Sequence, residues 1–208
     1  MLTRKTHWDQ VYKTKAPEQV SWTQTVPRTS LDFIHEFQLS ENSSIIDVGG
    51  GDSNLVDFLL QEGFKDITVL DISEIAIKKA KARLGRKGDL VKWVVSDITE
   101  FKTDQTYDLW HDRATFHFLT KDTEIAAYLQ IAGKVVSNYM IVGTFSENGP
   151  DKCSGLPVKQ YTEDQLQSEL NRDFEKVKCI NEDHVTPFKI KQNFLFCSFK
   201  KTPSVKST

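Results

Sequence analysis

The stretch that most constrains the fold is residues 45–53, which read Ile-Ile-Asp-Val-Gly-Gly-Gly-Asp-Ser. The apolar start predicts a buried strand. The glycines predict a tight turn, because glycine adopts positive φ angles and lets a ligand approach the backbone. A helix is expected directly after this turn, and its first N–H groups would be free to bind that ligand. Together these features predict a strand-turn-helix unit that binds a nucleotide.

The residues of this turn indicate which nucleotide would bind. A dinucleotide site needs the pattern G-x-G-x-x-G. Gly49 and Gly51 fit this pattern, but Asn54 stands where the third glycine would be, and no Gly-Lys-Ser/Thr of a P-loop follows. Asp47 precedes Gly49 by two residues, where a carboxylate would repel a pyrophosphate but suit a cationic group. The pattern therefore favours S-adenosylmethionine, which has an ammonium, a sulfonium and no phosphate, and disfavours a nicotinamide oxidoreductase.

Four segments resemble, in order and spacing, the motifs of class I S-adenosylmethionine-dependent methyltransferases. Residues 47–51 resemble the first motif, and residues 68–73 (Thr-Val-Leu-Asp-Ile-Ser) resemble the end of the second strand. Residues 94–98 and 107–112 resemble the ends of the third and fourth strands. The resemblance covers roughly residues 30–200 and is to small, bacterial-type members. It implies S-adenosyl-L-methionine as the cofactor.

The resemblance also implies roles for individual residues. Asp71, at the end of the second strand, would accept hydrogen bonds from the ribose hydroxyls. Asp97, at the end of the third strand, would meet the adenine amine, with an isoleucine after each acid enclosing the ring. The predicted cofactor-binding residues are Asp47, Gly49, Gly51, Asp71, Ile72, Asp97 and Ile98.

Apolar strands that alternate with amphipathic helices predict a parallel sheet with helices on both faces. Two last apolar stretches joined by a short link predict an antiparallel hairpin. The expected fold class is α/β: a three-layer sandwich with a seven-stranded, mostly parallel sheet ending in an antiparallel hairpin, as in Rossmann-like methyltransferases. The strands are expected at residues 45–48, 67–70, 91–95, 107–110, 139–145, 174–180 and 193–199.

The length of 208 residues predicts one domain. We expect it to cover residues 1–200, followed by a flexible tail at residues 201–208. Residues 1–30 are polar with scattered aromatic side chains, which would form a lid that excludes water from the cofactor, or else a packed N-terminal helix. The aromatic residues of this segment are Trp8, Tyr12 and Trp22.

The candidate catalytic residues follow the fourth expected strand, between residues 110 and 119. Ligands of open α/β sheets bind beyond the carboxyl ends of the strands. Two histidines, an acid and an arginine occur there within a short stretch, and we take His111, Asp112 and His117 as candidates. The alternative is a helix start with an internal pair between Asp112 and Arg113.

Cysteine usage gives no sign of a metal site or a disulfide framework. Cys153, Cys179 and Cys197 are odd in number and irregularly spaced. Cys179 and Cys197 lie in apolar strand patterns and are expected to be core thiols. Cys153, in the loop after the fifth strand, and His184, between the last two strands, are candidates for the substrate side of the site, although a loop histidine is more often plain surface.

Charge and hydropathy limit the classes of binding partner that are expected. The net charge of −2 creates no field that would attract nucleic acid, and no apolar run approaches the roughly 20 residues of a membrane helix. Residues 1–8 contain no apolar stretch of the kind found in signal peptides, so a cytoplasmic location is expected.

The predicted function is S-adenosylmethionine-dependent methyl transfer. A small molecule is the expected acceptor, and a protein side chain such as lysine is the second choice. A different possibility is a non-catalytic partner protein that keeps the cofactor fold. A protonated amine or a hydroxyl acceptor would need a general base, whereas a thiol would need none.

Overall fold

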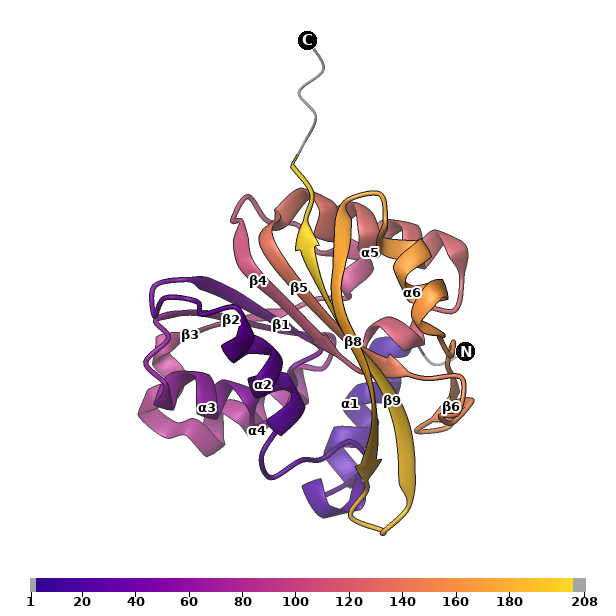
Figure 1. Cartoon of the computed structure of the whole chain (residues 1–208). Coiled ribbons are helices and arrows are strands. Elements are labelled where there is room, and N and C mark those ends of the chain that lie inside the picture. Colours follow the sequence, from indigo (N-terminus) through magenta and orange to yellow (C-terminus); the bar gives the residue numbers. More distant parts are fainter. Residues whose placement is uncertain (1–2, 204–208) are drawn as a thin grey trace.

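The computed structural model describes residues 3–203, which form a seven-stranded sheet with the order β3-β2-β1-β4-β5-β9-β8 (Figure 1). The strands are β1 (Ser44–Val48), β2 (Asp66–Asp71), β3 (Val91–Val95), β4 (Tyr107–Arg113), β5 (Val136–Phe145), β8 (Phe174–Val185) and β9 (Lys191–Lys201). The short strands β6 (Lys152–Cys153) and β7 (Leu156–Pro157) pair with each other outside this sheet.

The sheet is mostly parallel, as predicted. β1 pairs in parallel with β2 and β4, and the outer pairs β2–β3 and β4–β5 are parallel too. β9 runs antiparallel between β5 and β8, which forms the predicted terminal hairpin. The strand order reverses between β1 and β4. Ligands of open α/β sheets bind at such a point, beyond the carboxyl ends of the strands.

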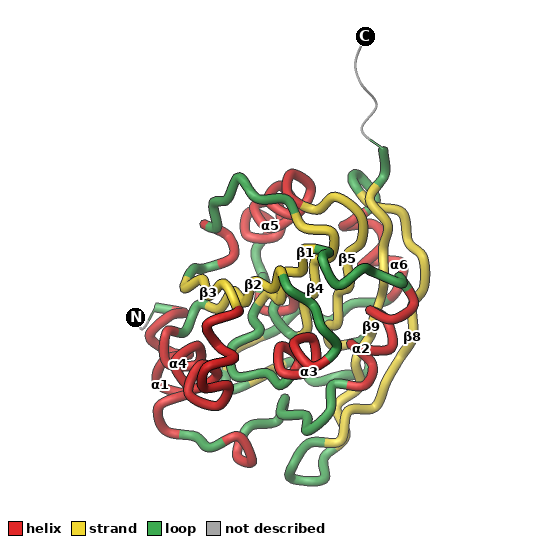
Figure 2. Tube along the Cα trace, turned by 90° about the vertical axis from the view of Figure 1, so that its left-hand side faces the viewer, coloured by secondary structure: helices red, strands yellow, loops and turns green. Residues whose placement is uncertain are grey.

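Helices cover both faces of the sheet (Figure 2). Alternate strand residues face opposite sides, so Trp110 packs with Tyr128 of α5, while Leu109 packs in the cluster that holds Phe33 of α2 and Leu55 of α3. The α-helices are α1 (Arg4–Thr14), α2 (Arg28–Glu36), α3 (Leu55–Gln61), α4 (Glu74–Leu84), α5 (Asp122–Val135) and α6 (Glu163–Leu170). The 3₁₀ segments are η1 (Pro17–Gln19), η2 (Gly85–Leu90), η3 (Ile98–Glu100) and η4 (Phe116–Phe118).

Six of the seven strands of the sheet are longer than predicted. β4 continues to Arg113, so His111 and Asp112 lie within a strand and not after it. β4 is flanked by β1 and β5, and pairing on both sides keeps these polar residues in the ladder. In the same way, β8 includes His184, and β9 includes Lys201, which was predicted as tail. The rest of the predicted tail is described only to residue 203, and residues 204–208 lie outside the described residues.

The prediction that Cys179 and Cys197 are separate core thiols is wrong. They form a disulfide across a sequence separation of 18 residues. The long β8–β9 hairpin sets them directly opposite each other in the strand register. This pairing depends on the hairpin geometry, which the cysteine spacing alone does not reveal.

Among residues 3–203, no helix is both long and apolar enough to cross a membrane.

Candidate functional site

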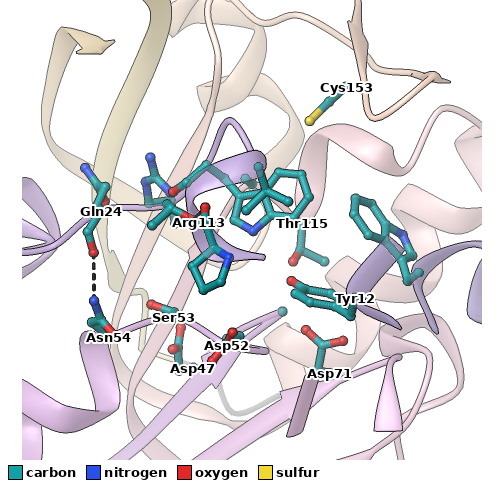
Figure 3. A pocket seen from close by; sticks show the side chains of 18 of the residues that line it. Tyr12, Gln24, Asp47, Asp52, Ser53, Asn54, Asp71, Arg113, Thr115 and Cys153 are labelled. Carbon is teal, nitrogen blue, oxygen red and sulfur yellow. Dashed lines mark hydrogen bonds between the residues drawn. The ribbon is translucent and has the colours of Figure 1, made fainter. Parts of the chain in front are cut away.

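A cavity of about 640 Å³ opens at the carboxyl ends of β1, β2 and β4 (Figure 3). Residues of the N-terminal segment close its other side, among them Trp8, Tyr12 and Trp22. In Figure 3, the carboxylates of Asp47 and Asp71 lie along the lower wall of the view and the thiol of Cys153 lies at the top. The cavity therefore has one acidic side.

The glycine turn after β1 approaches neighbouring side chains too closely for any other residue. Gly49 and Gly51 have φ angles of +69° and +42°, which favour glycine. A Cβ at Gly49 would collide with the hydroxyl of Thr115, and one at Gly51 would lie 2.7 Å from Oδ2 of Asp71. The Gly49 N–H donates to the Leu70 carbonyl at 2.7 Å, which fixes the turn against β2.

Asp71 is a buried acid, and one of its carboxyl oxygens faces the glycine turn. Its Oδ1 accepts a hydrogen bond of 2.7 Å from the Ser73 N–H, at the start of α4. Burial, with a smaller contribution from the negative charges of Asp47 and Asp9, raises the pKa of Asp71 to about 7. A ligand that donates hydrogen bonds to this carboxyl would favour its ionised form.

The remaining predicted cofactor residues lie in the same wall. Ile72, Asp97 and Ile98 line the cavity, whereas Gly51 shapes the turn without being part of the lining. Oδ1 of Asp97 accepts from the Thr99 N–H at 3.0 Å, and its Oδ2 lies 3.5 Å from the guanidinium of Arg4.

His111 lies at the centre of a buried chain of hydrogen bonds. Its Nδ1 lies 2.7 Å from Oδ1 of Asp47, its neighbour in the β1–β4 register, and its Nε2 lies 2.9 Å from Oγ of Ser30 on α2. The three residues line the cavity, and each is at most 3% exposed. In the tautomer that carries its proton on Nδ1, the ring donates to the Asp47 carboxylate and Nε2 accepts from the Ser30 hydroxyl.

Asp112 does not line the cavity. It points to the other face of β4, where Oδ1 accepts from the Thr115 and Phe116 N–H groups at 2.9 and 3.2 Å. Its Oδ2 accepts from the Tyr128 hydroxyl at 2.8 Å. Burial raises the pKa of Asp112 to about 6, against the effect of these bonds. Asp112 therefore shapes the backbone after β4.

His117 also lies outside the cavity lining and is fully buried. Its ring stacks on Phe145 at a centroid distance of 4.5 Å, and its Nδ1 accepts from the Phe145 N–H at 3.3 Å. Burial, followed by the charge of Arg113, lowers the pKa of His117 to about 3. The ring is therefore neutral at physiological pH.

The substrate-side candidates divide in the same way. Cys153 lines the cavity, and burial raises the pKa of its thiol to about 11. His184 lies outside the lining and donates from Nε2 to the Ser21 carbonyl at 2.6 Å. Trp8 packs edge-to-face on Trp22 at 5.6 Å, so the aromatic residues of the N-terminal segment form a packed wall.

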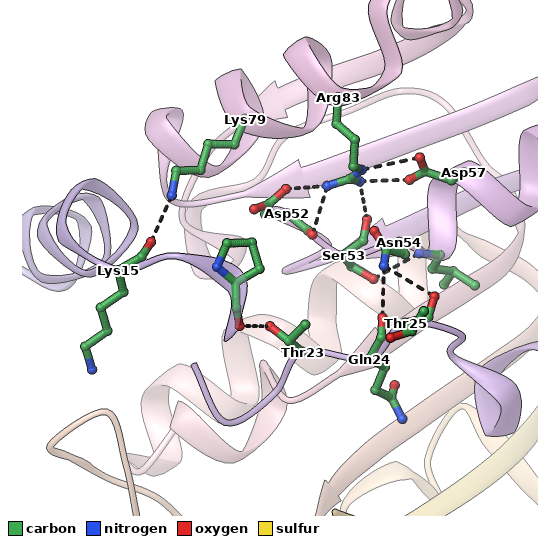
Figure 4. Close-up of polar contacts among 12 residues, drawn as sticks. Lys15, Thr23, Gln24, Thr25, Asp52, Ser53, Asn54, Asp57, Lys79 and Arg83 are labelled. Carbon is green, nitrogen blue, oxygen red and sulfur yellow. Dashed lines mark hydrogen bonds and ion pairs between the residues drawn. The ribbon is translucent and has the colours of Figure 1, made fainter. Parts of the chain in front are cut away.

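Polar contacts join this N-terminal segment to the glycine turn and to α4 (Figure 4). Nδ2 of Asn54 donates to the Gln24 carbonyl at 3.0 Å. Nζ of Lys79 donates to the Lys15 carbonyl at 3.0 Å. The guanidinium of Arg83 contacts Asp52, Ser53 and Asp57.

Sequence reasoning did not select Ser30 or Arg113, which both line the cavity. Ser30 carries no pattern that sets it apart from other helix serines. Arg113 was considered only as the partner of Asp112 in the alternative of a helix start, but its Nη1 donates to the Trp22 carbonyl at 3.0 Å. The residues next to Arg113 along the strand pointed to the place but not to this side chain. Within residues 3–203, no group of three or more histidine, cysteine, aspartate or glutamate residues could hold a metal ion.

Comparisons with known proteins agree with this geometry. A family described as "Methyltransferase domain" matches residues 45–138. The 1,6-didemethyltoxoflavin-N1-methyltransferase of Burkholderia thailandensis, solved with 1,6-didemethyltoxoflavin and S-adenosylhomocysteine bound, shares the fold. The TM-score is 0.73 at 17% identity, over 96% of this chain and 87% of that one. Residues 45–138 are similar to this family, and the likeness to the solved structure shows the fold that the resemblance implied.

Curated relatives match this chain over part of their length. The eEF1A lysine and N-terminal methyltransferase of Mus musculus is 24% identical over 126 residues, which are 60% of this chain and 18% of that protein. The malonyl-[acyl-carrier protein] O-methyltransferase of Anoxybacillus flavithermus is 34% identical over 88 residues, which are 41% of this chain and 33% of that protein. The match thus covers a third or less of the length of these relatives.

The residues at the glycine turn fit the cofactor of the family. The atoms nearest to a Cβ built on Gly50 or Gly51 are carboxylate oxygens, of Asp47 and Asp71 respectively. Such a cradle suits a ligand that offers hydroxyl donors and positive charge, and it disfavours a pyrophosphate.

Proposed function

We propose that this chain is an S-adenosylmethionine-dependent methyltransferase that transfers a methyl group to a small-molecule acceptor, with His111 as the general base. The observation that carries this proposal is the buried chain Asp47–His111–Ser30 in the cavity wall. A cavity of about 640 Å³ falls within the roughly 300–1,000 Å³ typical of small-molecule sites. The packed N-terminal wall supports a small acceptor because it restricts access from one side.

We assign the cofactor end to the acidic side of the cavity. Asp71 would accept the ribose hydroxyls, since its Oδ2 faces the glycine turn. Asp97 would accept the adenine amine, with Ile72 and Ile98 against the ring, and the turn of Gly49 and Gly51 would hold the methionine part. These assignments are supported by the shared wall of these residues.

When bound, the cofactor supplies an electrophilic methyl group on its sulfonium. The chain has to hold the acceptor in line with that group and keep water out, which can contribute roughly 7–11 kcal/mol to lowering the barrier. The acceptor loses one proton and gains the methyl group. The Ser30 hydroxyl takes the acceptor proton while passing its own to Nε2 of His111, and Asp47 stabilises the resulting imidazolium.

A lysine side chain of a protein is the alternative acceptor, and the 24% identity to a lysine methyltransferase supports it. In that case the side chain would have to enter past Trp8 and Trp22. The other alternative, a non-catalytic protein with the same fold, is disfavoured by the glycine turn and the acids around it, which fit a bound cofactor. Nucleic acid stays outside the proposal, as in the sequence-based prediction.

The test is a screen for release of S-adenosylhomocysteine. The purified protein is incubated with S-adenosylmethionine and a panel of small acids, thiols, amines and lysine peptides. We expect turnover with a small molecule and none with peptides. Turnover with peptides alone would refute the acceptor class. Failure of S-adenosylhomocysteine to bind in calorimetry would refute the site as a whole.

Three further statements stay predictions. They are the single-domain boundaries of residues 1–200, a lid function of residues 1–30, and a cytoplasmic location. The disulfide between Cys179 and Cys197 offers a test of the last, because structural disulfides persist mainly in oxidising compartments. Counting free thiols in protein isolated under acid quench would show whether the pair is oxidised in the cell.

A further inference from the structure

Arg113 is the last residue of β4 and lies in the wall of the cavity. Side chains two residues apart on a strand face the same side, about 6.6 Å apart along it. Arg113 is therefore the next side chain after His111 on the cavity face. Figure 3 shows it above the carboxylate of Asp47 and below the thiol of Cys153.

The guanidinium of Arg113 has only part of its hydrogen bonds made. Nη1 donates to the Trp22 carbonyl at 3.0 Å, and the Phe194 ring lies 4.9 Å from Cζ. Nε and Nη2 are buried and have no partner among residues 3–203. Burial lowers the pKa of Arg113 to about 10, against the nearby charge of Glu182, so the group is still a cation at neutral pH.

The two unused groups have a defined geometry. In a guanidinium, the Nε–H and one N–H of Nη2 point in parallel along the same edge. This edge forms two parallel hydrogen bonds to a carboxylate or a phosphate. A half-buried cation whose edge has no partner among residues 3–203 is a binding group for an anion.

Two other cations of the cavity wall pair with acids. Arg4 pairs with Glu124 at 2.9 Å, and Arg83 pairs with Asp57 at 2.8 Å. Lys79 donates to the Lys15 carbonyl, and Lys15 is exposed to solvent. Among the cations of the cavity wall, Arg113 alone has buried nitrogens with no partner among residues 3–203, and its single charge favours a carboxylate over a phosphate dianion.

The surroundings of Arg113 indicate the body of the ligand. Aromatic side chains line this part of the cavity, namely Trp22, Phe118, Phe145 and Phe194. They suit an apolar or aromatic skeleton. An acid held by Arg113 would extend along the cavity toward Ser30 and His111, where the proposed proton transfer takes place.

We propose that Arg113 binds the carboxylate of the methyl acceptor, so that the substrate is a small aromatic or apolar acid. This proposal rests on the proposed function, because it assigns the acceptor side of the same cavity. The rival explanation is that Arg113 binds the carboxylate of the cofactor. The acidic wall at the glycine turn places the cofactor on the side of Asp71 and Asp97.

The experiment uses matched pairs of acids and their primary amides. The probes are 2-aminobenzoate, 4-hydroxybenzoate, 3-mercaptobenzoate and indole-3-acetate, each with its amide, together with phenyl phosphate. Binding to the full chain saturated with S-adenosylhomocysteine is measured by calorimetry. Wild type, Arg113→Met and Arg113→Lys are compared, and Arg86→Met serves as a matched control because Arg86 is exposed and outside the cavity lining.

We expect wild type to bind at least one acid 100-fold more tightly than its amide. Arg113→Met should lose this preference and Arg113→Lys should keep about a tenth of it, while both bind S-adenosylhomocysteine within threefold of wild type. Arg86→Met should behave as wild type. An unchanged melting temperature with S-adenosylhomocysteine shows that the Arg113 variants fold.

Several results would overturn the proposal. They are equal affinity for acids and amides in wild type, no binding of any acid in the panel, or tighter binding of phenyl phosphate than of the acids. A tenfold loss of S-adenosylhomocysteine affinity in Arg113→Met would assign Arg113 to the cofactor. If wild type itself fails to bind S-adenosylhomocysteine, the proposed function fails, which is a separate outcome.

Discussion

The ionisation of Asp71 gives a prediction that links stability to cofactor binding. The pKa of this carboxyl is raised from 3.8 to about 7 in the folded protein, mainly by burial. Each pKa unit corresponds to about 1.4 kcal/mol, so ionising Asp71 destabilises the fold without ligand by on the order of 4 kcal/mol. Asp71→Asn removes the charge and keeps an oxygen for the Ser73 N–H.

The direction of this pH effect on stability depends on whether the folded or the unfolded state holds the Asp71 proton more tightly. The folded state keeps the Asp71 proton to higher pH than the unfolded state does. This contribution therefore favours folding most below pH 3.8, and it is lost as the pH rises to about 7, above which the loss is complete. Relative to wild type, Asp71→Asn should become more stable by about 3–4 kcal/mol between pH 4.5 and pH 8.

The same substitution should weaken binding of the cofactor. If Asp71 accepts the ribose hydroxyls as an anion, losing one such charged bond is worth roughly 1.5–3 kcal/mol, which is about 10–150-fold in affinity. Wild-type affinity for S-adenosylhomocysteine should also fall by up to about tenfold for each pH unit below 7. The affinity of Asp71→Asn should be nearly independent of pH.

The assay is urea denaturation of both proteins at half-unit intervals from pH 4.5 to pH 8, with calorimetry of S-adenosylhomocysteine at the same points. A stability difference between Asp71→Asn and wild type that does not change with pH would show that Asp71 titrates normally. Equal affinity of both proteins for S-adenosylhomocysteine at pH 8 would place the ribose away from Asp71. Either result refutes the corresponding half of the reasoning.

Three further predictions concern other parts of the molecule. His111→Ala should lower kcat by about 10²–10⁴-fold and keep the affinity for S-adenosylhomocysteine within threefold of wild type. His117→Ala should instead lower the melting temperature. Equal turnover of His111→Ala and wild type would leave catalysis to alignment alone. Asp97→Ala should weaken the binding of S-adenosylhomocysteine less than Asp71→Ala does, since one neutral hydrogen bond contributes about 1 kcal/mol. If calorimetry shows the reverse order of affinities, the roles of the two acids are exchanged. Reducing the Cys179–Cys197 disulfide opens a loop of 18 residues. This should remove about 3 kcal/mol of stability and lower Tm by about 6–12 °C. An unchanged Tm after reduction, measured by scanning calorimetry, would contradict a stabilising role of the disulfide.

Several parts of the site were predictable because they depend on local chemistry. The glycine turn is encoded by residues 47–51, since only glycine allows the positive φ angles and the close approach of Thr115 and Asp71. The acids at the ends of β2 and β3 follow from the strand pattern. Parallel strands end at one edge of a sheet, so Asp71 and Asp97 were expected to meet there, and both line the cavity.

The candidates after the fourth strand show the limit of such reasoning. His111, Asp112 and His117 looked equivalent along the chain, but only His111 lines the cavity. Alternation along β4 turns His111 and Arg113 to one face and Asp112 to the other. His117 is enclosed by the aromatic side chains of β5 and β9. The outcome depended on how far β4 extends, and that is decided by pairing with β1 and β5.

The sequence by itself determined the order of strands and helices, the glycine turn and the acids around it. These features follow from backbone preferences and periodic hydrophobicity, which act over a few neighbouring residues. The tertiary structure alone decided the contacts between residues far apart in the chain. It joined Ser30, Asp47 and His111 into one chain of hydrogen bonds, set Cys179 opposite Cys197, and left Nε and Nη2 of Arg113 buried without a partner among residues 3–203. Such contacts depend on register and on packing across the sheet, and no short segment of sequence contains either.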